Sequence, residues 1–281
     1  MRPRLGRGLN DLGLARPRPA PRPVPFPDAT PAPSPAIVCV TSGKGGTGKS
    51  VITSNLAVHL AAEGLNVLAV DADLGLANLH LLLGLPSSSG LLDVVERGVP
   101  LARVAADGPL GVRLAAGGSG LTELADLHPT RLLRLVRAME EVGADADVVL
   151  VDTGAGIGRA TTAFLYAIRD IVVVITADVT AMTDGYAVIK NVARNNRTAR
   201  IGVVVNRVGS AVEGLEVFGR VDQVSRRFLE RPLTYMGHVL EDRRVGASVA
   251  SRIPILLNQP AAPAAACLRG VARSLRLELL P

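Results

Sequence analysis

A glycine-rich segment between a strand-like run and a helix-like run leaves this chain few possible folds. Residues 37–40 read Ile-Val-Cys-Val, and residues 43–50 read Gly-Lys-Gly-Gly-Thr-Gly-Lys-Ser. Residues 51–60 then suit a helix. The order of strand, G-x-x-x-x-G-K-[ST] segment and helix is the context of a phosphate-binding loop. We therefore expect an α/β fold whose first strand ends at a nucleotide site.

The residue types in this loop suit phosphate binding. Three glycines let the backbone turn its N–H groups inward around phosphate oxygens, and the following helix directs its positive end toward the same anion. Lys49 would reach the β- and γ-phosphates, and Ser50 would ligate Mg²⁺. We expect ATP to contact the whole loop, which comprises Gly43, Lys44, Gly45, Gly46, Thr47, Gly48, Lys49 and Ser50.

The first lysine of the loop is unusual in a chain that otherwise uses arginine. Lys44, Lys49 and Lys190 are the only lysines among 31 basic residues, so two of the three lie in one loop. A compact ammonium group fits among packed phosphates where a planar guanidinium does not. This placement favours a role for Lys44 at the phosphates over a chance occurrence.

The composition fits one large α/β domain with an aliphatic core. The chain has 281 residues, of which 48% are apolar and only 2% aromatic, and it contains no tryptophan. No apolar run reaches the roughly 18 residues that span a membrane, and the N-terminus lacks the apolar segment of a secretory signal. Cys39 and Cys267 form no metal or redox motif and are expected to be reduced. We expect a cytoplasmic protein, with peripheral contact at the inner face of the cell membrane left open.

The first 35 residues differ from the rest of the chain. They hold ten of the nineteen prolines, together with six arginines and two aspartates, and so carry +4 of the net charge of +6. This composition predicts a disordered Pro/Arg-rich tail at 1–35, followed by a P-loop ATPase domain at 36–281. Leu5, Leu9 and Leu12 share one helical face, so a docking peptide and a plain solvated tail both remain open. The nearly neutral remainder argues against specific DNA binding.

Acidic residues follow two further strand-like runs. Residues 66–70 lead to Asp71 and Asp73, and residues 147–151 lead to Asp152. The carboxyl ends of parallel strands are where open α/β sheets bind ligands. A carboxylate that ends such a run holds Mg²⁺, directly or through water, in proteins that transfer phosphoryl groups. Asp152 is therefore a predicted magnesium residue, and the other two aspartates are expected at the same edge of the sheet.

Four more strands are expected, at residues 112–114, 171–175, 201–205 and 235–240, and those at 171–175 and 201–205 are wholly apolar runs. Such runs are typical of parallel sheets that are covered on both faces. Asn206 directly follows one of them, where its amide can donate to and accept from a base edge. The alternation of strands and helices predicts a doubly wound, mostly parallel sheet with helices on both faces.

Three helices carry specific expectations. The helix at 129–142 should bury four residues on one stripe, and Thr183 is the expected N-cap of a helix that ends at Arg194. The last helix, at 264–280, either covers the core or lies on an anionic membrane, and its narrow apolar stripe favours the core. The stripe of the first helix is Leu132, Leu133, Val136 and Met139, and that of the last is Leu268, Val271, Leu275 and Leu279.

Together these motifs resemble those of the MinD/ParA family of ATPases. Residues 44–50, Lys-Gly-Gly-Thr-Gly-Lys-Ser, are similar to the deviant Walker A motif of that family. Residues 71–78, 151–157 and 183–190 resemble its flagellar-number regulator branch, FlhG, also called FleN. They read Asp-Ala-Asp-Leu-Gly-Leu-Ala-Asn, Val-Asp-Thr-Gly-Ala-Gly-Ile and Thr-Asp-Gly-Tyr-Ala-Val-Ile-Lys. The matches extend from Ala36 to about Ser274.

The resemblance implies roles for the candidate residues. Lys44 would cross a dimer interface to the nucleotide of the second subunit, and Asp73 would position the attacking water. The other implied contacts are Lys49 as a catalytic residue at the phosphates, Ser50, Asp71 and Asp152 at Mg²⁺, and Asn206 at the base. The implied cycle is homodimerisation with ATP, followed by slow Mg²⁺-dependent hydrolysis. Implied partners are flagellar assembly proteins: a signal-recognition-type GTPase, a switch-complex protein and a transcription activator.

Three features depart from the flagellar branch. Its D-Q-A activating peptide has no counterpart in residues 1–35, and its I-P-x-D segment reads Val-Leu-Glu-Asp at 239–242. Only residues 277–281 remain for its amphipathic membrane tail. The alternatives are a septum-site MinD, a ParA-type positioning ATPase for DNA or cargo, and a nucleotide-gated adaptor whose hydrolysis is incidental.

Overall fold

An eight-stranded sheet organises the part of the chain that the structure describes. The computed structural model describes residues 34–75, 77–87, 90–117 and 129–280. The strands are β1 (Ala36–Ser42), β2 (Val67–Ala72), β3 (Ala106–Asp107), β4 (Arg113–Ala116), β5 (Val148–Thr153), β6 (Asp170–Thr176), β7 (Arg200–Val208) and β8 (Thr234–Leu240).

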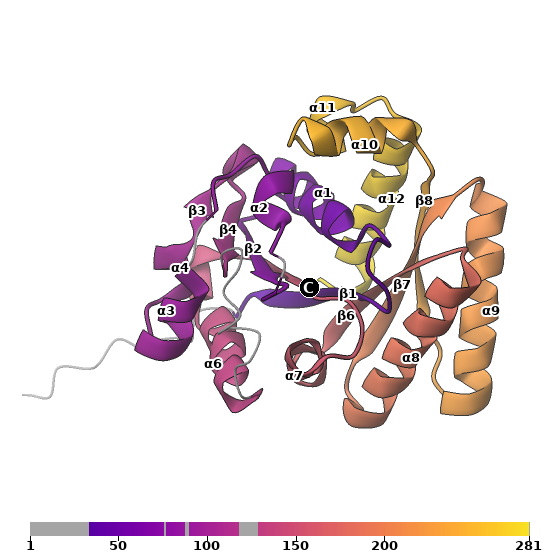
Figure 1. The fold of residues 1–281 in the computed structure, drawn as a ribbon, viewed down its shortest axis with the longest axis horizontal. Helices are drawn as coiled ribbons and strands as arrows, with labels where there is room; N and C mark the ends of the chain where they lie inside the picture. The colour runs from indigo at the N-terminus through magenta and orange to yellow at the C-terminus, as the bar shows by residue number, and fades with distance from the viewer. Residues whose placement is uncertain (1–33, 76, 88–89, 118–128, 281) are drawn as a thin grey trace, which may run out of the picture. The chain divides into compact units, whose positions relative to one another are not determined.

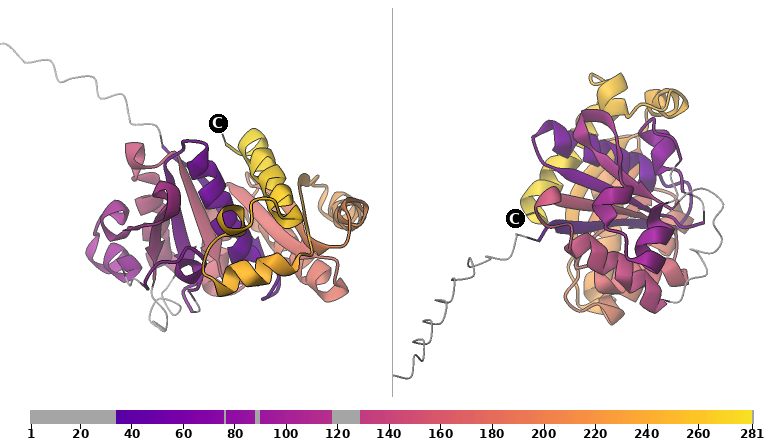
Figure 2. Two further views of the ribbon diagram at one scale, coloured as in Figure 1. Left: turned by 90° about the horizontal axis from the view of Figure 1, so that it is seen from above. Right: turned by 90° about the vertical axis from the view of Figure 1, so that its left-hand side faces the viewer.

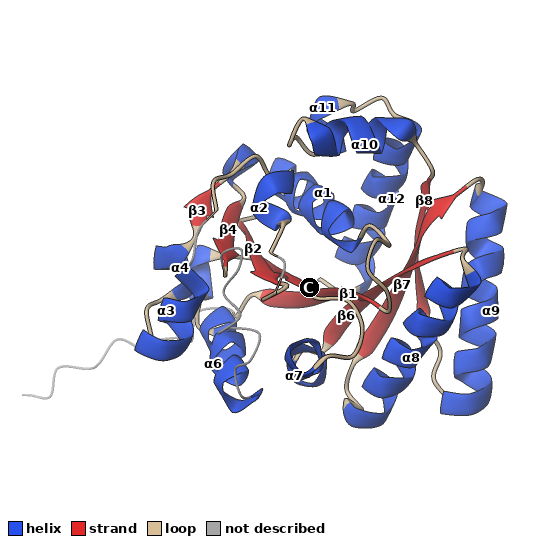
Figure 3. Cartoon of the chain, in the orientation of Figure 1, coloured by secondary structure: helices blue, strands red, loops and turns tan. Residues whose placement is uncertain are grey.

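The order of the strands is β3-β4-β2-β5-β1-β6-β7-β8. Every neighbouring pair is parallel except β3 with β4. The central strand β1 pairs with β5 on one side and with β6 on the other. Figure 3 shows the strands as one layer with helices on both sides, which confirms the predicted doubly wound, mostly parallel sheet.

Helices cover the two faces of the sheet (Figures 1 and 2). The sheet separates the core into two clusters, one on each face. No helix among the described residues is long and apolar enough to cross a lipid bilayer. One face carries α1 (Lys49–Ala62), α2 (Leu79–Leu82), α10 (Arg243–Ala250), α11 (Ile255–Asn258) and α12 (Pro263–Glu278). The other carries α3 (Gly90–Arg97), α4 (Leu101–Val104), α6 (Pro129–Glu140), α7 (Arg159–Ala167), α8 (Val179–Asn195) and α9 (Ala211–Leu229).

The core is aliphatic, as the composition predicts. Phe164 is the one aromatic among the largest fully buried side chains of the described residues, and the others are leucines and one isoleucine. Cys39 is buried in β1, Cys267 is half-buried in α12, and both are free thiols. Packing of β-branched and γ-branched side chains between the sheet and its helices therefore supplies most of the apolar burial.

Two details of the predicted helices are wrong. Leu133 is 41% exposed, and Leu135 is buried in its place, because the core-facing stripe of α6 follows the spacing of three and four residues from Leu132. The N-cap of α8 is Asp178, not Thr183, because the Asp178 side chain accepts the Ala181 N–H at 2.9 Å. Thr183 lies one turn inside the helix.

The last helix covers the core, as its stripe predicts. Leu268, Val271, Leu275 and Leu279 are all at most 3% exposed, and α12 packs between β8 and α1. Arg200 on β7 secures the end of this helix. Its guanidinium pairs with Asp170 at 2.7 Å and donates to the carbonyl oxygens of Glu278 and Leu279 at 3.1 and 2.8 Å.

We predict that Leu275→Ala lowers the free energy of unfolding by about 2–5 kcal/mol, because it opens a cavity between α12 and the sheet. The matched control is Leu277→Ala, since Leu277 lies on the same helix but is 82% exposed. Its effect should stay within about 0.5 kcal/mol. Urea unfolding followed by circular dichroism measures both changes. Equal effects of the two substitutions would contradict the packing of α12 described above.

Candidate functional site

The glycine-rich loop connects β1 to α1 at the carboxyl edge of the sheet. Gly46 and Gly48 have φ values of 80° and 87°, a region that glycine adopts without strain. A Cβ on Gly43 would lie 2.1 Å from the Asp184 carbonyl carbon, so glycine is also required at the start of the loop. The Thr47 hydroxyl is buried and has no hydrogen-bond partner among the described residues. The loop thus has the backbone shape and a free polar group for an anion.

Lys49 is the first residue of α1 and is buried beneath the loop. Its ammonium group donates to Asp152 Oδ1 at 2.8 Å and to Ser50 Oγ at 3.2 Å. Thr53, one turn along the helix, donates to the same carboxylate oxygen at 3.1 Å. Because Asp152 lies in β5, these bonds fix the start of α1 against the end of that strand.

Asp71 lies beside Asp152, in register on the neighbouring strand. The side chain is buried and accepts the Leu79 N–H at 2.8 Å and the Asp73 N–H at 3.2 Å. Burial, together with the negative charge of Asp152, raises the pKa of Asp71 to about 7. A divalent cation bound between the two carboxylates would favour their ionised forms.

Asp73 is half-buried and lies against the turn that follows β5. A Cβ built on Gly154 in that turn would lie 3.5 Å from Asp73 Oδ1. The Gly156 N–H donates to the Ser42 carbonyl at 2.8 Å, so the turn is attached to the end of β1. The Asp73 side chain therefore lies next to a turn that borders the loop.

Lys44 points away from the buried cluster and contacts the start of α8. Its ammonium group donates to Thr180 Oγ1 at 2.9 Å and lies 3.9 Å from Asp178 Oδ1. The side chain of Lys44 is 51% exposed. The two lysines of the loop therefore differ in environment, with Lys49 buried in an ion pair and Lys44 at the surface.

Asn206 lies inside β7 and not after its end as predicted, because this strand continues to Val208. Its side-chain N–H donates to the Thr47 carbonyl at 2.7 Å. A Cβ on Gly48 would lie 2.3 Å from the same nitrogen, so the side chain packs directly on the loop. The amide oxygen remains available to accept a hydrogen bond.

Two cavities open beside the loop. One, of about 390 Å³, is lined by the loop and by residues 176–178. The other, of about 310 Å³, is lined by Gly48, Val51, Ile52, Asn206 and part of the segment 239–246. The second has mostly apolar walls beside an amide, which suits a flat heteroaromatic base.

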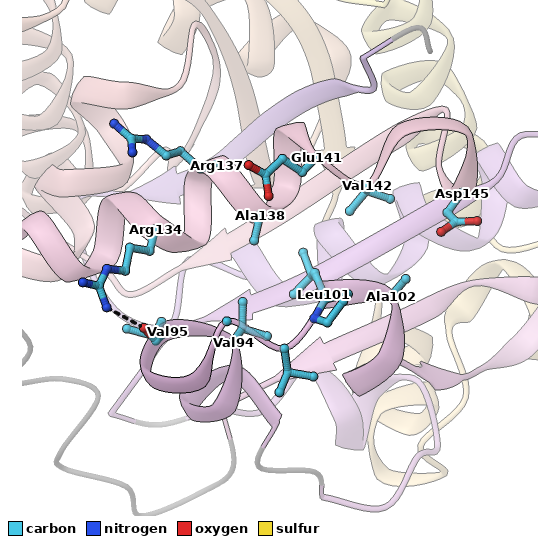
Figure 4. Close-up of a pocket in the computed structure, with 13 residues that line it drawn as sticks. Val94, Val95, Leu101, Ala102, Arg134, Arg137, Ala138, Glu141, Val142 and Asp145 are labelled. Atoms are coloured by element: carbon cyan, nitrogen blue, oxygen red, sulfur yellow. Dashed lines mark hydrogen bonds between the residues drawn. The ribbon is translucent and has the colours of Figure 1, made fainter. Parts of the chain in front are cut away.

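A larger cavity of about 520 Å³ lies elsewhere, between α3, α4 and α6 (Figure 4). Four valines and Leu101 line it together with four charged residues, of which Arg134 donates to the Val95 carbonyl. None of the predicted site residues lines it. We therefore place the candidate site at the loop.

The predicted residues thus gather around the loop, although their neighbours include several that the sequence did not single out. Thr53, Asp178 and Thr180 have no motif of their own, and only the structure shows that they contact Asp152 and Lys44. Thr53 follows Lys49 by four residues, a helical spacing that could have suggested the contact. Asp178 and Thr180 are 134 and 136 residues from Lys44 in the sequence, so no local pattern relates them.

The comparison with protein families agrees with this geometry. Residues 38–255 match the model described as CobQ/CobB/MinD/ParA nucleotide binding domain. Antiactivator FleN of Pseudomonas aeruginosa is 36% identical over 245 residues, which cover 87% of this chain and 88% of that protein. Flagellum site-determining protein YlxH of Helicobacter pylori is 35% identical over 203 residues, covering 72% and 68% respectively.

Solved structures of MinD proteins have a similar fold. The cell division ATPase MinD of Pyrococcus furiosus superposes with a TM-score of 0.71 at 26% identity, covering 86% of this chain and 98% of that one. MinD of Pyrococcus horikoshii, solved with Mg-ADP, also has a TM-score of 0.71, at 24% identity and with coverage of 85% and 95%. At 24% identity, the likeness to the Pyrococcus horikoshii structure shows that the two chains share a fold.

The raised pKa of Asp71 leads to a prediction for stability without nucleotide and Mg²⁺. Because its folded pKa lies above the unfolded value, the folded protein binds the extra proton between about pH 4 and pH 7. Stability should therefore fall as pH rises through this window. Between pH 4 and pH 8, the free energy of unfolding of the wild type should fall on the order of 3 kcal/mol more than that of Asp71→Asn.

Urea unfolding across this pH range, in the presence of a metal chelator, measures the difference. Asp107→Asn is the control, because Asp107 is an exposed carboxylate on β3, far along the sheet from the loop. It should follow the wild-type pH dependence. Identical slopes for the wild type and Asp71→Asn would show that Asp71 is ionised in the folded protein throughout.

Proposed function

Because this chain belongs to the CobQ/CobB/MinD/ParA family of nucleotide-binding proteins, we propose that it is an ATP-binding and ATP-hydrolysing dimerisation switch that regulates flagellar number and placement. One observation carries the proposal. The loop lysine, the loop serine and two buried carboxylates meet at one sheet edge, in a chain 36% identical to an antiactivator, FleN.

The residues of the loop fit ATP and Mg²⁺. Thr47 offers a buried hydroxyl without a partner, and a Cβ on Gly45 or Gly46 would meet nothing within 4 Å, so phosphate oxygens can approach the backbone. Mg²⁺ prefers oxygen ligands, which Ser50, Asp71 and Asp152 would supply. The Mg-ADP complex of the Pyrococcus horikoshii MinD supports this pairing of nucleotide and metal. In the nucleotide complex, Lys49 would exchange its bond to Asp152 for phosphate oxygens.

Hydrolysis would use the turn that borders the loop. Asp73 lies against this turn, and its carboxylate would align a water molecule with the γ-phosphate. The bound cation would neutralise charge on the phosphate oxygens, while the loop amides and Lys49 hold the nucleotide. Turnover is expected to be slow, as the resemblance to the MinD/ParA ATPases implies.

Dimerisation would place a second subunit against the exposed side of the loop. The Lys44 side chain is half exposed there, and the apolar side chains of Ile157 and Val179 are 53% and 71% exposed on the segments that flank it. Burial of these side chains would favour the contact between subunits. Lys44 would then leave Thr180 and reach the nucleotide of the second subunit.

We propose flagellar assembly proteins as partners: a signal-recognition-type GTPase, a switch-complex protein or a transcription activator. We also propose a cytoplasmic location with peripheral contact to the cell membrane. The alternative function is septum-site selection, which the likeness to solved MinD structures favours. Cells that lack the protein distinguish the two functions. We expect altered flagellar number with normal division sites, restored by wild-type protein and not by Lys49→Ala; displaced septa with normal flagella would support the alternative.

We further propose that residues 1–35 form a tail separate from an ATPase domain at 36–281. Residues 1–33 lie outside the described part of the chain, so this division rests on their composition. A variant that starts at Ser34 should keep the melting temperature and ATP affinity of the full chain but lose binding to a partner. Thermal unfolding and ATP titration test the first part. A large drop in melting temperature would make the tail part of the fold.

The different environments of the two loop lysines predict different defects. Lys49→Ala should abolish ATP binding, whereas Lys44→Ala should keep most ATP binding and lose ATP-dependent dimerisation. Each change removes a cation from phosphate and should cost on the order of 2–4 kcal/mol at the step that uses it. ATP titration and size exclusion measure the two steps. Arg103→Ala, an exposed cation on α4, is the control, and equal losses of ATP affinity in both lysine variants would refute a role for Lys44 across the interface.

Removal of the Asp73 carboxylate should affect turnover and not binding. A group that aligns the attacking water acts in the transition state, so Asp73→Ala should lower turnover roughly 10²-fold or more with nearly unchanged ATP affinity. The variant should accumulate as an ATP-bound dimer in size exclusion with ATP and Mg²⁺. Asp107→Ala controls for the loss of a carboxylate. A monomeric Asp73→Ala, or one without ATP affinity, would instead assign Asp73 to the metal.

A further inference from the structure

An arginine in a left-handed backbone conformation lies next to the candidate base contact. Arg207 follows Asn206 in β7, has a φ of 58°, and stands where the register between β7 and β8 shifts. Residues with a Cβ are strained in this region, and such strain persists at functional positions when the surroundings enforce it. The position therefore needs a reason other than the requirements of a strand.

The ion pair that Arg207 makes contributes little to the stability of the fold. Its Nε donates to Glu241 Oε2 at 2.8 Å, across the ends of β7 and β8. Both side chains are more than half exposed, at 58% and 57%. Ion pairs at such exposed positions contribute little to folding. A role for the Arg207–Glu241 pair in ligand binding accounts better for the strained backbone conformation of Arg207.

The carboxylate of Glu241 is available for a ligand, whereas that of its neighbour is not. Asp242 caps α10 by accepting the Arg244 N–H at 3.0 Å and also accepts the Ala264 N–H at 3.4 Å. Glu241 uses its backbone N–H to bind the Val208 carbonyl at 2.9 Å, which fixes its main chain at the strand end. Among the described residues, its side chain pairs with Arg207.

Arg207 and Glu241 line both cavities beside the loop. One cavity borders the loop residues that face phosphates, and the other contains the amide of Asn206 and apolar walls for a base. In a nucleotide, the ribose joins the phosphates to the base. The sugar of a nucleotide that occupies both regions would therefore pass the Arg207–Glu241 pair.

We propose that Glu241 binds the ribose hydroxyls of the nucleotide and that Arg207 is the positioning residue that holds its carboxylate in place. This inference rests on the proposed nucleotide-binding function and adds the recognition of the sugar. A carboxylate accepts hydrogen bonds from both the 2′- and the 3′-hydroxyl. A deoxynucleotide leaves one of these bonds unmade, so the site prefers ribonucleotides to deoxyribonucleotides.

Titration of the full-length protein with ATP, 2′-deoxy-ATP and 3′-deoxy-ATP, each with Mg²⁺, tests this proposal. We expect the wild type to bind ATP about tenfold more tightly than at least one of the deoxy analogues. In Glu241→Gln this preference should fall to about twofold or less, because the neutral amide is a weaker acceptor and no longer pairs with Arg207. Arg207→Gly should reduce the preference as well while relieving the backbone strain.

Two controls separate sugar recognition from effects on the fold. Glu230→Gly relieves the same kind of strain, since Glu230 has a φ of 53° at the end of α9, and it should leave the preference for ATP unchanged. Glu216→Gln removes an exposed glutamate from the same helix and should also leave the preference for ATP unchanged. Wild-type binding of ATP and both analogues within about twofold, or an undiminished preference in Glu241→Gln, would overturn the proposal. Failure of the wild type to bind ATP at all would instead overturn the proposed function.

Discussion

A buried ammonium group between the ends of neighbouring strands is the interaction on which this site depends. Lys49 reaches Asp152 at 2.8 Å, and Asp71 stands beside Asp152 in register. Without the ammonium group, two carboxylates would face each other in a buried position, which is costly. The ion pair between Lys49 and Asp152 therefore requires that α1 begin beside the end of β5. This requirement restricts the path that the loop can take between β1 and α1. In the proposed nucleotide complex, phosphate would take the place of the carboxylate at Lys49, and the carboxylate oxygens of the cluster would be left for a magnesium ion.

The sequence predicts those strands and helices that a continuous motif or an apolar run identifies. Strand, loop and helix around Lys49 form one continuous motif, and the apolar runs before Asp71 and Asp152 identify their strands, because strands covered on both faces are apolar throughout. Local patterns of this kind do not predict helices α3, α4 and α7. They are short, and the glycines and prolines around them leave no periodic stripe of sufficient length.

Other misses concern contacts between segments that are distant in the sequence. The partner of Lys44 on α8 and the bond from Asn206 to the Thr47 carbonyl depend on how the strands align, which no local pattern encodes. The positive φ of Arg207 is likewise invisible, because arginine rarely adopts it and only the shift between β7 and β8 imposes it. The family resemblance identifies the candidate residues, and the structure adds which of them are buried together.

The order of the strands also has a consequence for how this protein forms on the ribosome. β1 and β2 are the first two strands in the chain, yet β5 lies between them in the sheet. Lys49 and Asp152 are 103 residues apart, so translation at about 5–20 residues per second delays their meeting by on the order of ten seconds. During that interval two apolar strands lack the neighbour that will separate them. A nascent chain of this topology should therefore rely on chaperones, or on late collapse, until β5 has been synthesised.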